Sequence, residues 1–266
     1  MYKFNYHKAD SLDAAASHLA SGDDPKLLAG GMTLIPTMKQ RLAAPSDLID
    51  LGGIESLSSI SVEGGIVTIG AMTRHADVAA SQEVRGAIPA LALLAGSIGD
   101  PQVRNRGTIG GSLANSDPAA DYPAAVLGLG ATIVTDRREI SGDDYFLDIF
   151  ETALEEDEIV TAIRFPVPDA AAYVKFPNPA SRYAVVGVFV SRTGGNVRVG
   201  VTGAGPCAFR QSEMETVLAR DFSQAALEPV SVSPDGLNED MHASAAYRAN
   251  LVSVGARRAV AQIAGD

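Results

Sequence analysis

The sequence contains few residues of the kinds that hold metals. Only one of its 266 residues is a cysteine, Cys207, which excludes an internal disulfide bond. A lone thiolate also cannot ligate an iron–sulfur cluster, so any such cluster has to belong to another chain. The four histidines are scattered and show no His-Glu-x-x-His pairing, so we expect no metal site and interpret each as a surface or satisfied structural side chain: His7, His18, His75 and His242.

Long apolar runs and an excess of positive charge are also absent. No stretch of eighteen consecutive apolar residues exists, so we expect no membrane span. The first residues lack the apolar segment of a signal peptide, which predicts a cytoplasmic protein. A net charge of −11 argues against nucleic acid and against an anionic membrane as partners, because the overall field repels phosphate groups. A single dinucleotide can still bind through local main-chain donors and a few placed cations.

Two of the Gly-Gly pairs in the sequence lie close to both hydroxyl residues and cations. The first pair, Gly30-Gly31, ends an apolar strand-like run and precedes Thr33 and a predicted helix. The second pair, Gly110-Gly111, lies within the segment Thr-Ile-Gly-Gly-Ser at 108–112. Asp117-Pro118 then predicts a helix start, with aspartate as the N-cap and proline at the first helical position, and we expect the helix over 119–127.

Both glycine pairs suit the binding of a diphosphate. Glycines let main-chain N–H groups approach an anion closely, so we expect free N–H donors at Gly30, Gly31, Gly110 and Gly111. Hydroxyl groups add further donors, and two such turns together can hold both ends of a diphosphate. The alternative is that each pair forms only a tight turn closing a strand–helix unit. The Gly-x-Gly-x-x-Gly pattern of Rossmann sites is missing from both segments.

The order of the two motifs resembles a known family. Ala-Gly-Gly-x-Thr-Leu-Ile-Pro, followed later by Arg-Asn-Arg-Gly-Thr-Ile-Gly-Gly-Ser-Leu-Ala-x-x-Asp-Pro-Ala-Ala-Asp, is similar to the FAD-carrying medium subunit of the molybdenum hydroxylases, such as carbon monoxide and xanthine dehydrogenases. The resemblance covers almost the whole chain. It implies an α+β fold: a PCMH-type, vanillyl-alcohol-oxidase-like FAD-binding domain over 1–165, with subdomains at about 1–55 and 56–165, and a small C-terminal α+β domain over 166–266.

The resemblance also implies which residues contact the cofactor. The flavin carries the redox chemistry, so no separate catalytic residue is expected, and the chain's tasks are to bind and orient the ring. The absence of histidine or cysteine beside either glycine turn favours non-covalent FAD. The implied contacts come from the two motifs and four later positions: Ala29, Gly30, Gly31, Met32, Thr33, Thr108, Ile109, Gly110, Gly111, Ser112, Asp121, Val160, Lys175 and Tyr183.

Several of these polar residues have a second interpretation. Asp121 matches a flavin-contacting carboxylate of the family, yet an acid in the first turn of a helix is also stabilised by the helix dipole. Arg104 and Arg106 either bring positive charge to the diphosphate or pair with neighbouring acids. Lys175 matches a lysine beside the cofactor, and its pattern also fits an ordinary lysine on an edge strand.

The segment around Tyr183 departs from the family's pattern. Many relatives carry an aromatic residue here next to the flavin, where a movable ring could gate the acceptor face; a core aromatic is the alternative. Arg182 precedes it where many relatives have aspartate, which alters the expected hydrogen bonding. Further upstream, the acidic segment 143–158 predicts a solvated surface from which five apolar side chains pack inward: Tyr145, Phe146, Leu147, Ile149 and Phe150.

The resemblance implies an electron-transfer role within a larger enzyme. A large chain would carry the molybdenum cofactor, a small chain two [2Fe–2S] clusters, and the assembly would be a dimer of heterotrimers. This chain would pass electrons from the clusters to an external acceptor and would not touch the hydroxylated substrate. Two alternatives remain open: a stand-alone FAD-dependent oxidoreductase, and a scaffold that keeps the fold without the cofactor.

Overall fold

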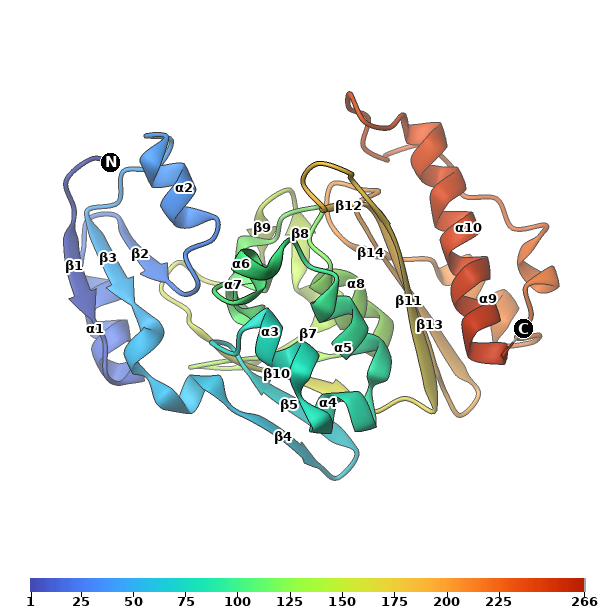
Figure 1. Ribbon diagram of the computed structural model, residues 1–266, viewed down its shortest axis with the longest axis horizontal. Helices are drawn as coiled ribbons and strands as arrows, with labels where there is room; N and C mark the ends of the chain where they lie inside the picture. Colours follow the sequence, from blue (N-terminus) through green and yellow to red (C-terminus); the bar gives the residue numbers. More distant parts are fainter. Residues whose placement is uncertain (266) are drawn as a thin grey trace.

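The computed structural model describes residues 1–265, which form three units in a row, each built on its own sheet (Figure 1). The N-terminal unit has a three-stranded parallel sheet in the order β1-β3-β2. Its strands alternate with helices, as the connections of parallel strands require. The bounds are β1 (Asn5–Lys8), α1 (Leu12–Ser21), β2 (Pro25–Leu28), α2 (Leu34–Lys39) and β3 (Asp47–Asp50), followed by the 3₁₀ turns η1 (Leu51–Gly53) and η2 (Glu55–Ser58).

The middle unit has a five-stranded antiparallel sheet in the order β4-β5-β10-β6-β7, so the late strand β10 lies at its centre. Six helices accompany this sheet, and all of them except α6 contribute residues to its apolar core. The bounds are β4 (Ile60–Glu63), β5 (Ile66–Gly70), α3 (His75–Ala80), α4 (Gln82–Ala87), α5 (Pro89–Gly96), α6 (Pro101–Arg104), α7 (Ile109–Asn115), α8 (Tyr122–Leu129), β6 (Thr132–Thr135), β7 (Glu139–Ser141), η3 (Gly142–Asp144), β8 (Phe146–Asp148), β9 (Glu151–Thr152) and β10 (Val160–Pro166).

The C-terminal unit is a four-stranded antiparallel sheet. Its own helices pack on one face of this sheet, and a helix of the middle unit packs on the other. Side chains alternate along a strand, so Val186 and Val188 meet α10 on one face while Phe189 joins the core of the middle unit on the other. The bounds are β11 (Ala170–Pro177), β12 (Ala184–Thr193), β13 (Asn196–Thr202), β14 (Phe209–Arg210), α9 (Ser212–Leu218), η4 (Ala225–Leu227) and α10 (Ala245–Ala264).

Helix α8 packs directly against the backbone of the C-terminal sheet. Every residue from Tyr122 to Leu129 is buried. A Cβ atom on Gly200 of β13 would lie 2.2 Å from the carbonyl oxygen of Ala124, so only glycine allows this approach. The helix is therefore shared between the middle and C-terminal units.

The start of this helix differs from the sequence prediction. Helix α8 begins at Tyr122 with Pro123 in its first turn, and Asp117 is not its N-cap. The carboxylate of Asp117 instead accepts a hydrogen bond from the amide of Ala119 at 2.8 Å, which makes a separate turn. That turn follows Ser116, whose left-handed backbone (φ 45°) ends α7.

The acidic segment 143–158 also differs in part. Tyr145 is buried and Phe146 packs against the core, as expected. Leu147, Ile149 and Phe150 were predicted to pack inward, but more than half of each side chain is exposed. Within residues 1–265, strands β8 and β9 pair only with each other, so no third strand extends this ribbon beside the turn.

Candidate functional site

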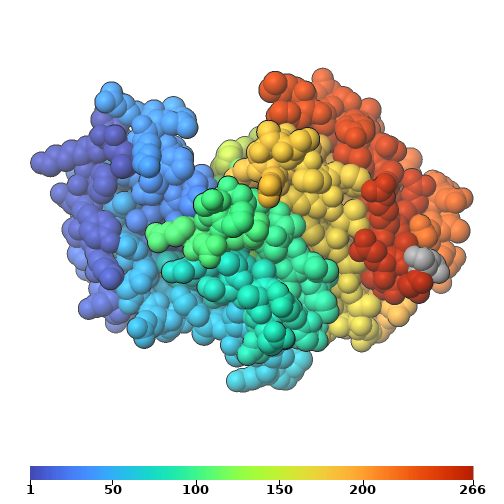
Figure 2. Space-filling model, viewed as in Figure 1, coloured from blue at the N-terminus to red at the C-terminus, as the bar shows by residue number. Residues whose placement is uncertain are grey.

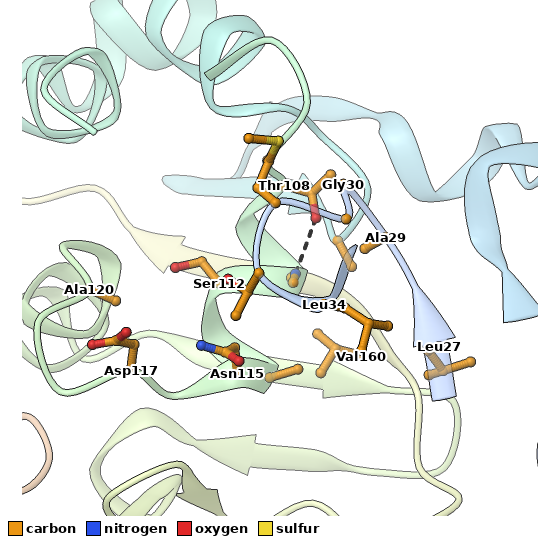
Figure 3. A pocket seen from close by; sticks show the side chains of 18 of the residues that line it. Leu27, Ala29, Gly30, Leu34, Thr108, Ser112, Asn115, Asp117, Ala120 and Val160 are labelled. Carbon is orange, nitrogen blue, oxygen red and sulfur yellow. Dashed lines mark hydrogen bonds between the residues drawn. The ribbon is translucent and has the colours of Figure 1, made fainter. Parts of the chain in front are cut away.

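A cavity of about 640 Å³ lies where the three units meet. Its walls come from the first glycine turn, the segment around α7, the stretch before β10 and a loop of the C-terminal unit. Figure 2 shows the molecule hollowed between the N-terminal unit in blue and the remainder of the chain. Both glycine motifs line this cavity, and Figure 3 shows Gly30 of the first beside Thr108 of the second. Its volume is within the range of cofactor sites.

The first glycine turn offers main-chain donors. Strand β2 ends at Leu28, and the chain turns through Gly31, whose φ of +73° favours glycine. Within residues 1–265 no group accepts a hydrogen bond from the amides of Gly30, Gly31, Met32 and Thr33. Unpaired N–H groups beside a cavity are an anion site, so this turn fits the diphosphate of a dinucleotide.

The two motifs are in direct contact. A Cβ atom on Gly30 would lie 2.1 Å from the carbonyl oxygen of Arg106, and one on Gly111 would lie 3.3 Å from the Cβ of Ala29. A side chain at Gly30 would therefore force the two turns apart. The pairing of the motifs, which the sequence only suggested, is a packing contact between the N-terminal and middle units.

The second glycine turn was expected to offer free N–H groups, and this prediction was wrong. The amide of Gly110 donates to the carbonyl oxygen of Ala71 at 2.9 Å, and that of Gly111 donates to Oγ1 of Thr108 at 3.2 Å, the dashed line in Figure 3. Thr108 is the N-cap of α7 and thus uses its hydroxyl within the protein. The main-chain amides of Ile109 and Ser112 are also bonded.

Glycine at 110 has a packing reason instead. A Cβ atom there would lie 2.5 Å from the Cβ of Ala71, so α7 could not approach the end of β5. The second motif contributes side chains to the cavity rather than main-chain donors: Ser112 and Asn115 lie along its wall in Figure 3.

Asp121 and Lys175 form a buried ion pair at one end of the cavity. Their side chains are 4% and 8% exposed, and Nζ of Lys175 lies 2.9 Å from Oδ2 of Asp121. The hydroxyl of Tyr173 donates to Oδ1 of Asp121 at 2.6 Å. Burial raises the pKa of the Asp121 carboxyl, while Lys175 and Tyr173 oppose that rise.

These contacts bear on the alternatives for both residues. Asp121 is the N-cap residue of α8, makes no capping hydrogen bond to its helix and lines the cavity, so its contact with the flavin stays a prediction. Lys175 lies on the edge strand β11, but its ammonium group is buried behind Asp121 and also donates to the carbonyl oxygen of Ser97 at 3.1 Å. An ordinary solvent-facing lysine is therefore excluded.

The loop before β12 brings Tyr183 to the cavity mouth. Its ring is 44% exposed and lines the cavity, so it is not a core aromatic. Burial of the hydroxyl, with the carboxylates of Asp117 and Asp121 nearby, raises the pKa of Tyr183. Arg182 has a left-handed backbone with φ of 62°, and its amide donates to the carbonyl oxygen of Asn178 at 2.9 Å.

Among residues 1–265, neither of the two arginines before the second turn forms an ion pair with an acid. Arg104 donates from one guanidinium nitrogen to the carbonyl oxygens of Ile98 and Gly99, at 2.9 and 3.0 Å. Arg106 contributes its carbonyl oxygen to the contact with Gly30. Both residues thus hold the loops around the cavity.

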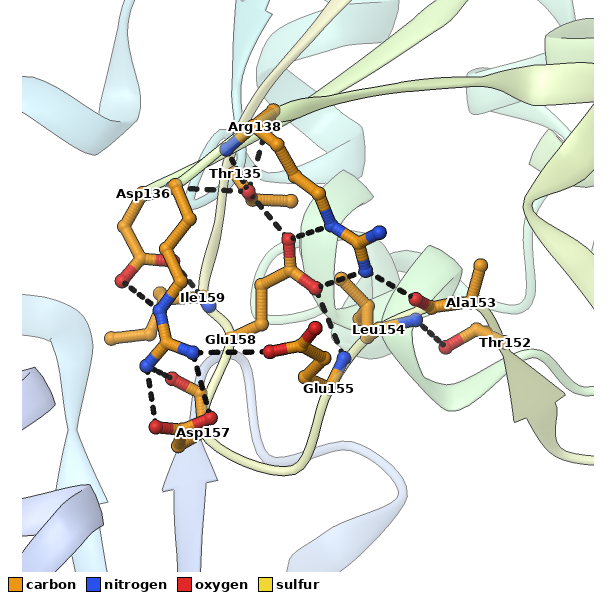
Figure 4. A network of polar contacts seen from close by, with 11 residues as sticks. Thr135, Asp136, Arg138, Thr152, Ala153, Leu154, Glu155, Asp157, Glu158 and Ile159 are labelled. Carbon is orange, nitrogen blue, oxygen red and sulfur yellow. Dashed lines mark hydrogen bonds and ion pairs between the residues drawn. The ribbon is translucent and has the colours of Figure 1, made fainter.

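A polar network fixes the wall opposite the glycine turns (Figure 4). Glu158 accepts hydrogen bonds from Arg138 at 2.9 and 2.8 Å and from Thr135 at 2.7 Å. Hydrogen bonding to Arg138, chiefly, lowers the pKa of Glu158 to about 2. Glu158 and Val160 both line the cavity, so this network holds the start of β10 in place.

The histidines follow the prediction only in part. His7 lies 2.8 Å from a carboxylate oxygen of Asp47 and stacks on His18 with ring centroids 4.2 Å apart. His75 is buried against the cavity, and its Nδ1 has no hydrogen-bond partner, so the expectation of a satisfied histidine was wrong there. No group of three or more potential metal ligands occurs among residues 1–265. In the same part of the chain, no helix is both long and apolar enough to cross a membrane.

Comparison with known families accounts for this geometry. Residues 2–168 match the family model described as the FAD binding domain in molybdopterin dehydrogenase. The chain belongs to this family. It therefore carries an FAD-binding domain of the molybdopterin dehydrogenases, which are oxidoreductases, and the predicted α+β fold class is confirmed. The four free amides of the first glycine turn fit the diphosphate of the FAD that the family binds.

Relatives outside the family model extend the match to the C-terminal unit. The chain is 36% identical to the carbon monoxide dehydrogenase medium chain of Hydrogenophaga pseudoflava, over 97% of this chain and 96% of that one. It is 35% identical to the nicotine 6-hydroxylase medium subunit of Paenarthrobacter nicotinovorans, with the same coverage. The fold matches carbon monoxide dehydrogenase from H. pseudoflava with a TM-score of 0.89 at 35% identity, over 99% of this chain and 98% of that chain.

A second solved structure shows that the match is not limited to carbon monoxide dehydrogenases. Quinoline 2-oxidoreductase from Pseudomonas putida 86 matches with a TM-score of 0.89 at 28% identity, covering 99% of this chain and 97% of that one. Enzymes named for different substrates thus share this fold.

Sequence reasoning missed several residues of the cavity wall. They are polar side chains that were not among the predicted contacts: His75, Asn115, Asp117 and Ser181. Asn115 and Asp117 lie within the second motif, so their place in it was the available signal. No comparable signal marked His75, which reaches the cavity only through folding.

Proposed function

We propose that this chain is the electron-transfer subunit of a cytoplasmic molybdenum hydroxylase. It receives electrons from [2Fe–2S] clusters on a small partner chain and delivers them to an external acceptor. A large partner chain carries the molybdenum cofactor, and the complete assembly is a dimer of heterotrimers. The observation that carries the proposal is the cavity at the junction of the units, with four unpaired main-chain amides at its first glycine turn.

The residues of the cavity divide the work of binding. The amides from Gly30 to Thr33 hold the diphosphate, and the hydroxyl of Ser112 faces them from the second motif. Asp121, paired with Lys175, places an acceptor at the end of the cavity near Tyr183. Bound FAD supplies the redox chemistry, so the protein contributes orientation and the exclusion of water.

The proposed domain division follows the sheets. Residues 1–165 form the FAD-binding domain, with subdomains at about 1–55 and 56–165, and residues 166–266 form the C-terminal domain. Two observations support this division: the N-terminal unit has its own small core, and the C-terminal sheet starts directly after β10. FAD is held without a covalent bond, since Met32 occupies the tip of the first turn.

Two matched glycine variants test the site. Gly31→Ala places a methyl group 2.9 Å from Cγ1 of Ile35 at a backbone of φ +73°, so it distorts the first turn. Gly64→Ala carries the same kind of backbone strain, with φ +57°, in a hairpin turn that has nothing within 4 Å. After incubation with FAD and removal of excess, we expect flavin absorbance from the wild type and Gly64→Ala, and little from Gly31→Ala.

Two results would count against the proposal. A wild-type chain that shows no flavin absorbance after incubation with FAD and removal of the excess would refute the proposal that this chain binds FAD. Equal flavin content in the two glycine variants would show that the first turn does not hold the cofactor.

A further inference from the structure

His75 lies beside the second glycine motif and is fixed there by main-chain contacts. It is the first residue of α3, and its main-chain amide donates to the carbonyl oxygen of Gly107 at 2.9 Å. Its neighbour Arg74 forms an isolated antiparallel bridge with Thr108. The imidazole therefore has a fixed place beside the turn that leads into α7.

The imidazole ring of His75 is buried and has no hydrogen-bond partner among residues 1–265. His75 is only 4% exposed, and its Nδ1 is sealed from solvent and cavity alike. Nε2 is not sealed: it lies against Gly107, where a Cβ atom would be only 2.6 Å away, and both residues line the cavity. Buried polar nitrogens are normally hydrogen-bonded, so Nε2 is the ring atom left to meet a group bound in the cavity.

The charge state of the ring determines what it can offer. Burial, chiefly, and the nearby Arg104 guanidinium lower the pKa of His75 to about 4. The ring is thus neutral at pH 7 and carries one N–H. A proton on Nδ1 would find no acceptor in the surrounding chain, whereas a proton on Nε2 lies on the cavity side of the ring.

We propose that His75 is a further cofactor-contacting residue, which donates a hydrogen bond from Nε2 to an oxygen atom of bound FAD. This role rests on the proposed function. Packing alone does not explain a histidine here: the ring meets Tyr122 with centroids 5.4 Å apart, a contact that an apolar side chain of similar size would also make. Nε2 is the polar atom of the ring that a ligand can reach, while Nδ1 keeps no partner in either case.

Three substitutions separate a donor from a packing residue. His75→Leu removes both nitrogens, His75→Gln keeps an amide N–H near the position of Nε2, and His75→Asn keeps one near Nδ1. The full chain is titrated with FAD at pH 7.5, followed by flavin fluorescence, and the melting temperature of each FAD-free variant is measured beside it. We expect His75→Leu to weaken FAD binding roughly 10-fold, the effect of one lost hydrogen bond.

The pair of amide variants decides the test even if His75→Leu does not fold. We expect His75→Gln to bind FAD within about 3-fold of the wild type and His75→Asn to bind as weakly as the leucine variant. Equal affinities of the two amide variants, or wild-type affinity in His75→Leu, would overturn the role of His75. A wild-type chain that does not bind FAD would instead overturn the proposed function itself.

Discussion

Breaking the Asp121–Lys175 pair from one side should destabilise the protein strongly. Lys175→Met leaves the Asp121 carboxylate 4% exposed, with the hydroxyl of Tyr173 as its remaining side-chain partner. Removing one partner of a buried ion pair typically costs about 3–5 kcal/mol, because the other charge stays out of water without compensation. The reverse change, Asp121→Asn, leaves the Lys175 ammonium buried without a counter-charge, with only uncharged carbonyl acceptors such as that of Ser97.

The double variant gives the sharper result. Asp121→Asn combined with Lys175→Met leaves no buried charge at this place, so we expect it to recover about 2 kcal/mol or more of the summed single losses. Urea unfolding of the FAD-free chain, followed by far-UV circular dichroism, measures each free energy of unfolding. Circular dichroism suits this chain because it contains no tryptophan for fluorescence.

A surface pair provides the control. Lys26 and Asp24 lie 3.0 Å apart, but their side chains are 54% and 57% exposed. Lys26→Met should therefore cost at most about 1 kcal/mol. If Lys175→Met costs no more than Lys26→Met, Asp121 is reached by water in solution, and the argument that the pair places a dry carboxylate beside the cofactor is refuted.

Two further predictions follow from buried contacts. The pKa of His75 is lowered to about 4, so the unfolded chain takes up a proton before the folded chain does as pH falls. The wild type should therefore lose about 2 kcal/mol of stability between pH 7 and pH 5, and His75→Leu should not show this loss. Parallel curves of unfolding free energy against pH for the two proteins, measured by urea unfolding, would contradict this. Gly110→Ala should cost about 1–3 kcal/mol through its clash with Ala71, seen as a lower melting temperature, and an unchanged melting temperature would show that α7 can move away.

The sequence allowed the first glycine turn to be located together with its role. Gly30 and Gly31 follow an apolar strand and precede a helix, and the turn is indeed where free amides meet the cavity. The second turn looks the same in sequence, but its amides are used by Ala71 and Thr73 at the end of β5. Only the three-dimensional approach of that strand decides between the two uses, and no local pattern records it.

Other differences have the same origin. A local pattern showed that Leu147, Ile149 and Phe150 are apolar, but it could not show that β8 and β9 pair with no third strand. The start of α8 was misplaced because Asp117 next to proline is a typical capping signal, and the left-handed Ser116 and the buried partners of Asp121 shift the helix onset. Long-range contacts overrode local preference in each case.

The close approach of α8 to β13 has a consequence for how this family can change. The match to the FAD-binding family model ends at residue 168, before the sheet that covers α8 begins. A chain shortened there would open the face of α8 that now meets Gly200 and Phe189, exposing apolar surface beside the flavin domain. The hundred or so residues after the match thus cannot be removed or exchanged independently of the rest. Any replacement for this segment has to keep a glycine where its sheet approaches α8, a helix that lies far upstream in the sequence.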